Sequence, residues 1–317
     1  MFNRRIQKIG RSSYFISLPK KWVEQFNLDK GNIIKLSIGR NGSLIIEPSN
    51  EAKEENIATI HLTSTISRDI ISKYLLGYKT IKIVSNRGLT EDEVKTIKDT
   101  VRFLIGLEVV EEGLNEITIQ SMLDVESIHP SKLISREGII AEGILRDAIT
   151  SLVKKDINTA LLASRRDEEI NRFYFLLVRV LRSALQNYNI ISKFNLTPLD
   201  IVDYRLAASY IESIGDCATN IARCSIEIIN NNTIEEAKLS KIVDIGNKIV
   251  GFYRKSITAF LGKDYKTAND IILTVKRFHE EIGSEMKNVN GRLFNIISNL
   301  DRIAMFIIDI ADLVLIP

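Results

Sequence analysis

The feature that most constrains the fold is an internal repeat in the C-terminal part of the chain. Residues 148–160, AITSLVKKDINTA, align with residues 256–268, SITAFLGKDYKTA, and six of these thirteen positions are identical. A second, shorter similarity aligns residues 211–216 with residues 300–305. The apolar residues around these segments recur at helical spacing. We therefore predict two three-helix repeats, at about 131–230 and 233–317, that together form a six-helix bundle.

The first fifty residues have a different pattern, typical of short strands around one small helix. Pro19 opens the predicted helix, and Asn41-Gly42 is a strong hairpin turn. Strands are predicted at residues 5–9, 14–18, 34–38 and 44–47. A segment of this size buries too little surface to fold alone without a metal or disulfides. The sequence thus predicts a homodimer in which two chains share one small barrel.

This N-terminal pattern resembles the AbrB/MazE/SpoVT swapped-hairpin family. The strings that carry the resemblance are residues 6–10 (IQKIG), 16–20 (ISLPK) and 28–32 (LDKGN). Asn32 lies at a turn position, where the family usually has Asp. The resemblance implies that residues 1–50 form a dimeric swapped-hairpin β-barrel that binds DNA.

The charge distribution agrees with DNA binding. The whole chain carries +3, but residues 1–50 hold nine Lys or Arg against three acids, which gives +6 and leaves −3 for the remainder. Cations neutralise backbone phosphates, and hydroxyls in a loop can contact the same backbone. A solvated basic surface is the alternative. The candidate DNA-binding residues are Arg4, Arg5, Lys8, Arg11, Ser12, Lys20 and Lys21.

Residues 57–127 are predicted to form a small α/β unit. Thr90 caps its second helix, and Gly113 marks a hairpin between its last two strands. Strands are expected at 57–62, 79–84, 107–112 and 116–122, and helices at 67–76 and 91–105. No phosphate-binding loop or catalytic motif is present in this unit. We interpret it as a spacer or a second dimer surface.

The helical region, residues 131–317, resembles PhoU through its pair of three-helix repeats. The most specific string is residues 210–222, YIESIGDCATNIA, in which a Glu and an Asp flank three residues ending in Ile-Gly, followed by Asn-Ile. The predicted fold class is therefore multi-domain α+β. It comprises a swapped-hairpin barrel, a small α/β unit and a bundle of two PhoU-like repeats.

A row of oxygen ligands in the first repeat is a candidate metal site. Glu212, Asp216 and Asn220 are spaced by four, so they share one helix face. Hard oxygen ligands suit a divalent or ferric metal such as iron, zinc or manganese, which could in turn hold phosphate. The PhoU resemblance implies the same, and it adds Asp167 and Glu168 on the preceding helix. A solvated acidic face is the alternative interpretation.

The second repeat departs from this pattern. Asp301 is followed by Met305 where a carboxylate is expected, and His279 and Glu280 replace the expected Asp region. Asp309 compensates in part. The sequence thus favours one metal site over two, and it places that site beside Glu212 and Asp216.

Other observations narrow the class of protein. The three histidines lack ligand spacing, and no catalytic triad or glycine-rich phosphate loop is found, so an enzyme is not predicted. Cys217 and Cys224 lie about 10 Å apart along one helix, too far for a disulfide. Asp309 and Asp312 interrupt the apolar tail, and no signal peptide is predicted. A cytoplasmic protein without membrane insertion is expected.

These features together favour a homodimeric, DNA-binding transcriptional regulator of phosphate uptake with a PhoU-like sensor body. One alternative is a protein-interaction module that modulates phosphate transporter components, with the N-terminal domain serving to dimerise. Another is a metal-dependent phosphatase or hydrolase, which needs a metal with an open coordination position. A steep salt dependence of DNA binding distinguishes the regulator, and turnover of a phosphoester distinguishes the hydrolase.

Overall fold

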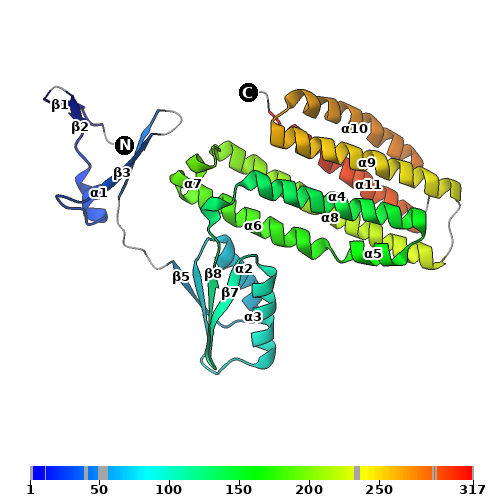
Figure 1. Ribbon diagram of the computed structural model, residues 1–317, viewed down its shortest axis with the longest axis horizontal. Helices are drawn as coiled ribbons and strands as arrows, with labels where there is room; N and C mark the ends of the chain where they lie inside the picture. Colours follow the sequence, from blue (N-terminus) through cyan, green and yellow to red (C-terminus); the bar gives the residue numbers. More distant parts are fainter. Residues whose placement is uncertain are drawn as a thin grey trace. The chain divides into compact units, whose positions relative to one another are not determined.

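The computed structural model describes residues 3–10, 12–38, 42–48, 56–231, 236–287, 289 and 291–315. The chain divides into two compact units, residues 1–56 and residues 57–317. The first unit is small and β-rich, and the second contains an α/β layer and a long helical bundle (Figure 1). The predicted fold class, mixed α+β with a β-rich start and a helical C-terminal region, is confirmed.

Where it is described, the N-terminal unit contains two antiparallel hairpins and one short helix. Its elements are β1 (Gln7–Ile9), β2 (Ser13–Phe15), α1 (Lys20–Gln25), β3 (Ile34–Ile38) and β4 (Leu44–Pro48). β1 pairs with β2, and β3 pairs with β4, as two separate sheets within the described residues of this single chain. β1 and β2 are shorter than predicted. Their hairpin closes at the Ile9–Ser13 pair beside Gly10, whose φ is +64°, so three residue pairs remain.

The turn after α1 explains how Asn32 substitutes for the expected Asp. The helix ends as the amide of Leu28 donates to the carbonyl of Val23 at 2.9 Å. The chain then turns through Gly31, whose φ of +95° favours glycine. The amide of Asp29 donates to Oδ1 of Asn32 at 2.5 Å. An amide oxygen therefore accepts the hydrogen bond that a carboxylate oxygen could accept at this position.

The α/β layer has a four-stranded sheet in the order β5-β6-β8-β7, in which β5 and β6 are parallel and the other pairs antiparallel. Its elements are β5 (Ile57–His61), α2 (Ile66–Leu75), β6 (Thr80–Val84), α3 (Glu91–Phe103), β7 (Leu107–Glu112) and β8 (Glu116–Ser121). Apolar residues of both helices and of the strands form one core. Ile70, Ile97 and Ile117 lie at its centre, fully buried.

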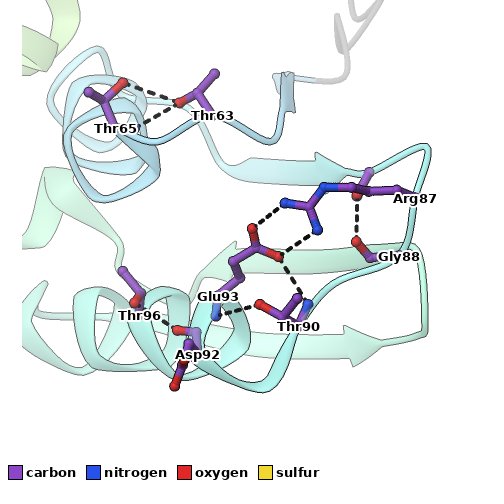
Figure 2. Close-up of polar contacts among 9 residues, drawn as sticks. Thr63, Thr65, Arg87, Gly88, Thr90, Asp92, Glu93 and Thr96 are labelled. Atoms are coloured by element: carbon purple, nitrogen blue, oxygen red, sulfur yellow. Dashed lines mark hydrogen bonds and ion pairs between the residues drawn. The ribbon is translucent and has the colours of Figure 1, made fainter.

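The N-terminus of α3 has the predicted cap (Figure 2). The amide of Glu93 donates to the Thr90 hydroxyl at 3.4 Å, and the Glu93 carboxylate accepts from the Thr90 amide at 3.0 Å. This reciprocal pair satisfies two helix-end donors. Arg87 pairs with the same carboxylate at 2.5 Å. The hydrogen bond from the Thr90 amide and the contact with Arg87 lower the pKa of Glu93. The Glu93 carboxylate therefore serves to stabilise the start of α3.

Among the described residues, eight α-helices follow the α/β layer. They are α4 (Pro130–Lys154), α5 (Ile157–Ser164), α6 (Asp167–Gln186), α7 (Tyr188–Lys193), α8 (Pro198–Asn231), α9 (Glu236–Gly262), α10 (Tyr265–Met286) and α11 (Gly291–Asp312). The second helix of the first repeat is thus divided into α5 and α6 at Arg165 and Arg166, and a short α7 precedes the third helix. Within the described ranges, no helix combines the length and apolar composition that a bilayer crossing requires.

The turn between the first two helices is built alike in both repeats. Lys155 adopts a left-handed conformation with φ of +51°, and Asp156 caps the next helix. The Asp156 carboxylate also accepts from the hydroxyl of Thr159 at 2.7 Å. The second repeat has the same arrangement, with φ of +52° and a hydroxyl contact of 2.6 Å, at Lys263, Asp264 and Thr267. The aligned Lys-Asp pair is therefore a helix stop followed by a helix start.

Two arginines of α6 join the bundle to the α/β layer. Arg179 is buried and donates to the carbonyls of Tyr74 and, at 3.0 Å, Tyr78, at the end of α2. Arg172 donates to the carbonyl of Phe103, the last residue of α3, at 3.1 Å. Both guanidiniums therefore meet helix C-termini, where unpaired carbonyls favour a cation. The layer has its own core but is held against α6 by these contacts.

Candidate functional site

The predicted DNA contacts lie on the surface of the N-terminal unit. Lys8 in β1 lies opposite Tyr14 in β2, with its ammonium 5.8 Å from the ring centroid. Lys20, the first residue of α1, pairs with Glu24 at 3.5 Å. Arg11 lies outside the described residues. The others are all exposed: Arg4, Arg5, Lys8, Ser12, Lys20 and Lys21.

Apolar side chains of the same unit are also exposed. Among the described residues from 3 to 48 none is buried. Five large apolar residues are between 61% and 77% exposed, namely Ile6, Ile9, Tyr14, Ile33 and Ile38. A single chain thus leaves on its surface the alternating residues that strands normally bury.

Carboxylates of α6 and α8 come together in the first repeat. Asp167 is the first residue of α6, and Glu212 and Asp216 lie one turn apart on α8. Burial, together with a hydrogen bond and the charge of Asp167, raises the pKa of Asp216 to about 6. Burial and the charges of Asp216 and Asp167 also raise the pKa of Glu212. The three groups therefore repel one another when ionised.

A fourth carboxylate, Glu137 of α4, lies beside this cluster and was not among the predicted ligands. Its side chain is fully buried, and neither carboxylate oxygen has a hydrogen-bond partner among the described residues. Burial and the charge of Glu212 raise the pKa of Glu137 well above its usual value, which Arg205 partly offsets. The sequence signal that could have identified Glu137 as buried was its spacing. It lies three residues from both Ile134 and Ile140, on the buried face of α4.

The remaining predicted ligands have other surroundings. Asn220 accepts from Arg223 at 3.4 Å and lines a polar cavity of about 310 Å³ between α8 and α11. Glu168 is exposed in the first turn of α6. In the part of the chain that the structure describes, no group of three or more His, Cys, Asp or Glu is placed to hold a metal. The carboxylates are thus near enough to shift one another's pKa without forming a closed three-ligand set.

The equivalent helix pair of the second repeat has a different contact. His279 of α10 lies with Nδ1 2.6 Å from Oδ1 of Asp301 on α11. Met305, in the position aligned with Asp216, is 42% exposed. Asp309 lies two turns beyond Asp301, and burial together with the charge of Asp312 raises its pKa. The second repeat therefore pairs an acid with an imidazole where the first gathers carboxylates.

Two family models match separate parts of this chain. Residues 134–225 match the PhoU domain, and residues 7–54 match the antidote-toxin recognition domain of MazE, a bacterial antitoxin. The bundle is PhoU-like, and the N-terminal unit is MazE-like. The PhoU match covers the first repeat, in which the YIESIGD string and the carboxylates lie.

One relative and two solved structures are similar to this chain over more than half of its length. A phosphate-specific transport system accessory protein PhoU homolog from Clostridium acetobutylicum is 21% identical over 188 residues, which is 58% of this chain and 83% of that protein. PhoU from Pseudomonas aeruginosa matches with a TM-score of 0.52 at 19% identity, over 60% of this chain and 96% of that one. PhoU from Streptococcus pneumoniae matches with a TM-score of 0.46 at 18% identity, over 58% and 91%. The Pseudomonas structure shows a shared PhoU fold.

Proposed function

We propose that this chain is a homodimeric, DNA-binding transcriptional regulator of phosphate uptake, in which the PhoU-like body senses a signal. The observation that carries the proposal is the N-terminal unit, which exposes a run of cations and a set of strand-spaced apolar residues together. The cations suit a phosphate backbone. The apolar residues suit a second copy of the same unit.

The proposed dimer is supported by the absence of a core in the described N-terminal residues. Alternating positions of β1 and β3 carry Ile9, Leu36 and Ile38, which are 61%, 60% and 77% exposed. Burying such side chains contributes about 25 cal/mol for each Å² of apolar surface removed from water. A partner that interleaves its hairpins with these strands would supply that burial and double the number of cations on one surface.

DNA binding is supported by the MazE-like match and by the charge of the surface. Residues 1–21 contain six Lys or Arg and no Asp or Glu. Each phosphate contact releases condensed counterions, so the logarithm of affinity falls with the logarithm of salt at about −0.9 per contact. A link to phosphate uptake is supported by the PhoU-like bundle and by the Clostridium relative, which is named for phosphate-specific transport.

The test is a salt titration with the full chain. A labelled duplex from the region upstream of its own gene is titrated by fluorescence anisotropy, beside a duplex of scrambled sequence. We expect tighter binding of the first duplex and a steep salt slope. Arg5→Ala should lower that slope by about one per chain, whereas Lys30→Ala, on the turn after α1, should leave it nearly unchanged. A shallow slope with no change in Arg5→Ala would contradict DNA binding.

One alternative is a protein-interaction module for phosphate transporter components whose N-terminal unit only dimerises. It predicts a stable dimer together with weak binding to both duplexes. Sedimentation of the same samples separates the two functions, because dimerisation is common to both and the salt-dependent DNA complex belongs to the regulator alone.

We further propose a divalent or ferric cation as a ligand of the body, held between Asp167 and Asp216 with Glu212 nearby. The raised pKa of Asp216 supports this, because two carboxyls that share a proton at their contact can share a cation there instead. The bound cation would supply positive charge to the cluster, and waters or an anion would complete its ligands. Glu168 and Asn220 are not needed for this pairing.

A further inference from the structure

An apolar groove of about 460 Å³ lies between α6 and α8 on the first repeat. Its floor is formed by the buried side chains of Val178, Leu181 and Ile201. The walls are formed by Leu185, Val202 and Leu206, whose side chains are 56%, 54% and 39% exposed. The groove is thus a concave apolar surface that the bundle leaves open to solvent, in the size range of binding sites.

The apolar surface continues beyond the groove along α8. Leu199 is 76% exposed and lies three residues before Val202 and seven before Leu206. This i, i+3, i+7 spacing places the three side chains in one stripe about 10 Å long. A stripe of this length and spacing suits the apolar face of another helix more closely than it suits a compact small molecule.

The charged side chains that line the groove are both arginines, of which Arg205 also interacts with the carboxylates of Glu137 and Glu212. Arg182 and Arg205 belong to its lining, which consists of described residues and contains no Asp or Glu, so its formal charge is +2. The guanidinium of Arg205 lies 4.8 Å from the ring centroid of Tyr174, which holds it at one rim. Arg182 is exposed on α6. The groove therefore combines an apolar floor with cations at its edges.

This charge selects among possible occupants. If a second copy of this chain bound through the same groove, the two grooves would face each other across a two-fold axis. Arg182 and Arg205 of both copies would then lie in one interface. Like charges in a desolvated interface are unfavourable. We propose that the groove docks an amphipathic helix of a partner protein, with leucine-type residues on one face and Asp or Glu beside them. The proposal is independent of DNA binding, which involves the N-terminal unit.

The test uses the full chain and a fluorescein-labelled helical peptide with leucines at i, i+3, i+4 and i+7 and glutamates on both flanks. We expect saturable binding by anisotropy with Kd of about 1–100 μM. Arg182→Glu should weaken this binding about tenfold and strengthen the binding of a lysine-flanked version of the peptide. Val202→Asn should also weaken it about tenfold, through loss of apolar contact. Both residues are exposed, and circular dichroism checks that each variant is folded.

Matched controls come from α10. Arg277→Glu and Leu273→Ser change an exposed cation and an exposed leucine on the same bundle, and both should bind the peptide as wild type does. The proposal is overturned by no saturable binding up to about 1 mM peptide, by equal binding of the lysine-flanked peptide, or by equal affinities in all four variants. It is also overturned if Val202→Asn dissociates the dimer, or if anionic vesicles compete the peptide away.

Discussion

In the first repeat the second and third helices meet through carboxylates, whereas in the second repeat they meet through a histidine and an aspartate. Burial, together with the contact and the charge of Asp167, raises the pKa of Asp216 to about 6. His279 and Asp301, 2.6 Å apart, combine a donor with an acceptor. One helix pair thus brings like-charged groups together, and the other contains its own hydrogen-bond donor.

The turns of the same two repeats are nearly identical. Asp156 and Asp264 accept hydroxyl hydrogen bonds of 2.7 and 2.6 Å, and the preceding lysines share a left-handed φ near +50°. The residues that start and stop helices have therefore been kept in both copies, while the residues between helices have diverged. The comparison teaches that the shared part of the repeat specifies the turns and helix ends, whereas the carboxylate contact between the second and third helices is a feature of the first copy that differs in the second.

The largest effect is expected for cation binding. Asp216→Asn should reduce bound iron, zinc or manganese from the wild-type content to none, because an amide cannot replace the charge at the Asp167 contact. Asp301→Asn in the second repeat should leave the content unchanged, since His279 already pairs with that acid. Elemental analysis after incubation with each metal measures both, and circular dichroism confirms the helices. Equal metal content in the two variants would remove the distinction between the repeats.

The second prediction concerns Glu137, whose counterpart along α9 is Ile245. Glu137→Met should stabilise the protein at neutral pH by about 2 kcal/mol, because it removes two buried oxygens without partners. Ile245→Glu should destabilise the protein, because it places a carboxyl group at a buried apolar position. Urea denaturation of both variants measures the changes. A less stable Glu137→Met would mean that this carboxylate has a stabilising partner.

The same variant should alter the pH dependence of stability. Because the pKa of Glu137 is raised in the folded state, the folded chain holds its proton where the unfolded chain has lost it. The wild type therefore loses stability as pH rises from the unfolded value of about 4.3 through the folded pKa. The gain in Glu137→Met should accordingly be larger at pH 8 than at pH 4. A gain that is constant with pH would show that packing alone is responsible.

Local patterns of sequence predicted the fold well, and contacts between distant segments explain what they missed. Thr90 and Pro19 were recognised because a capping residue acts on its immediate neighbours. Arg179 was not, because the carbonyls it meets are about a hundred residues earlier in the chain. Its partners depend on how α6 packs against α2, which helical periodicity does not specify.

The same reasoning applies to the candidate site. The spacing of four placed Glu212 and Asp216 on one face, and both contribute to the cluster. It also included Asn220, yet that side chain meets Arg223 on its own helix, one turn beyond the carboxylates. Glu137 was missed because it comes from another helix, α4, than the predicted ligands. Its neighbours on that helix are apolar, and their spacing predicts a core position, not a polar site. A helix face can be predicted from spacing, but not the residues that a neighbouring helix brings to it.

A smaller effect is expected at the caps. Asp156→Ala and Asp264→Ala should each lower Tm by about 2–4 °C, because each removes the side chain that accepts from the first amides of a helix. The two decreases should be similar, since each aspartate accepts from the amide and from the hydroxyl of the threonine three residues further on. Thermal melts followed by circular dichroism measure them. Decreases that differ severalfold would show that the repeats are unequal in their folding signals as well as in their chemistry.

The smallest effect is expected at the lysines before those caps. Lys155 and Lys263 have φ of +51° and +52°, a region that costs an L residue with a side chain about 1–2 kcal/mol. Glycine removes this strain but loses more conformational entropy on folding, by roughly 0.5–1 kcal/mol. Lys155→Gly should therefore stabilise the chain by about 0.5–1 kcal/mol in urea denaturation. Lys263→Gly should gain less, because it also removes the ion pair between the Lys263 ammonium and the Asp200 carboxylate at 2.6 Å. Because the two sites lie in different turns with no shared partners, the double variant should show the sum. An equal gain at the two turns would mean that the Lys263–Asp200 ion pair contributes nothing measurable to stability, and the two turns would then be equivalent in their side chains as well as in their backbone.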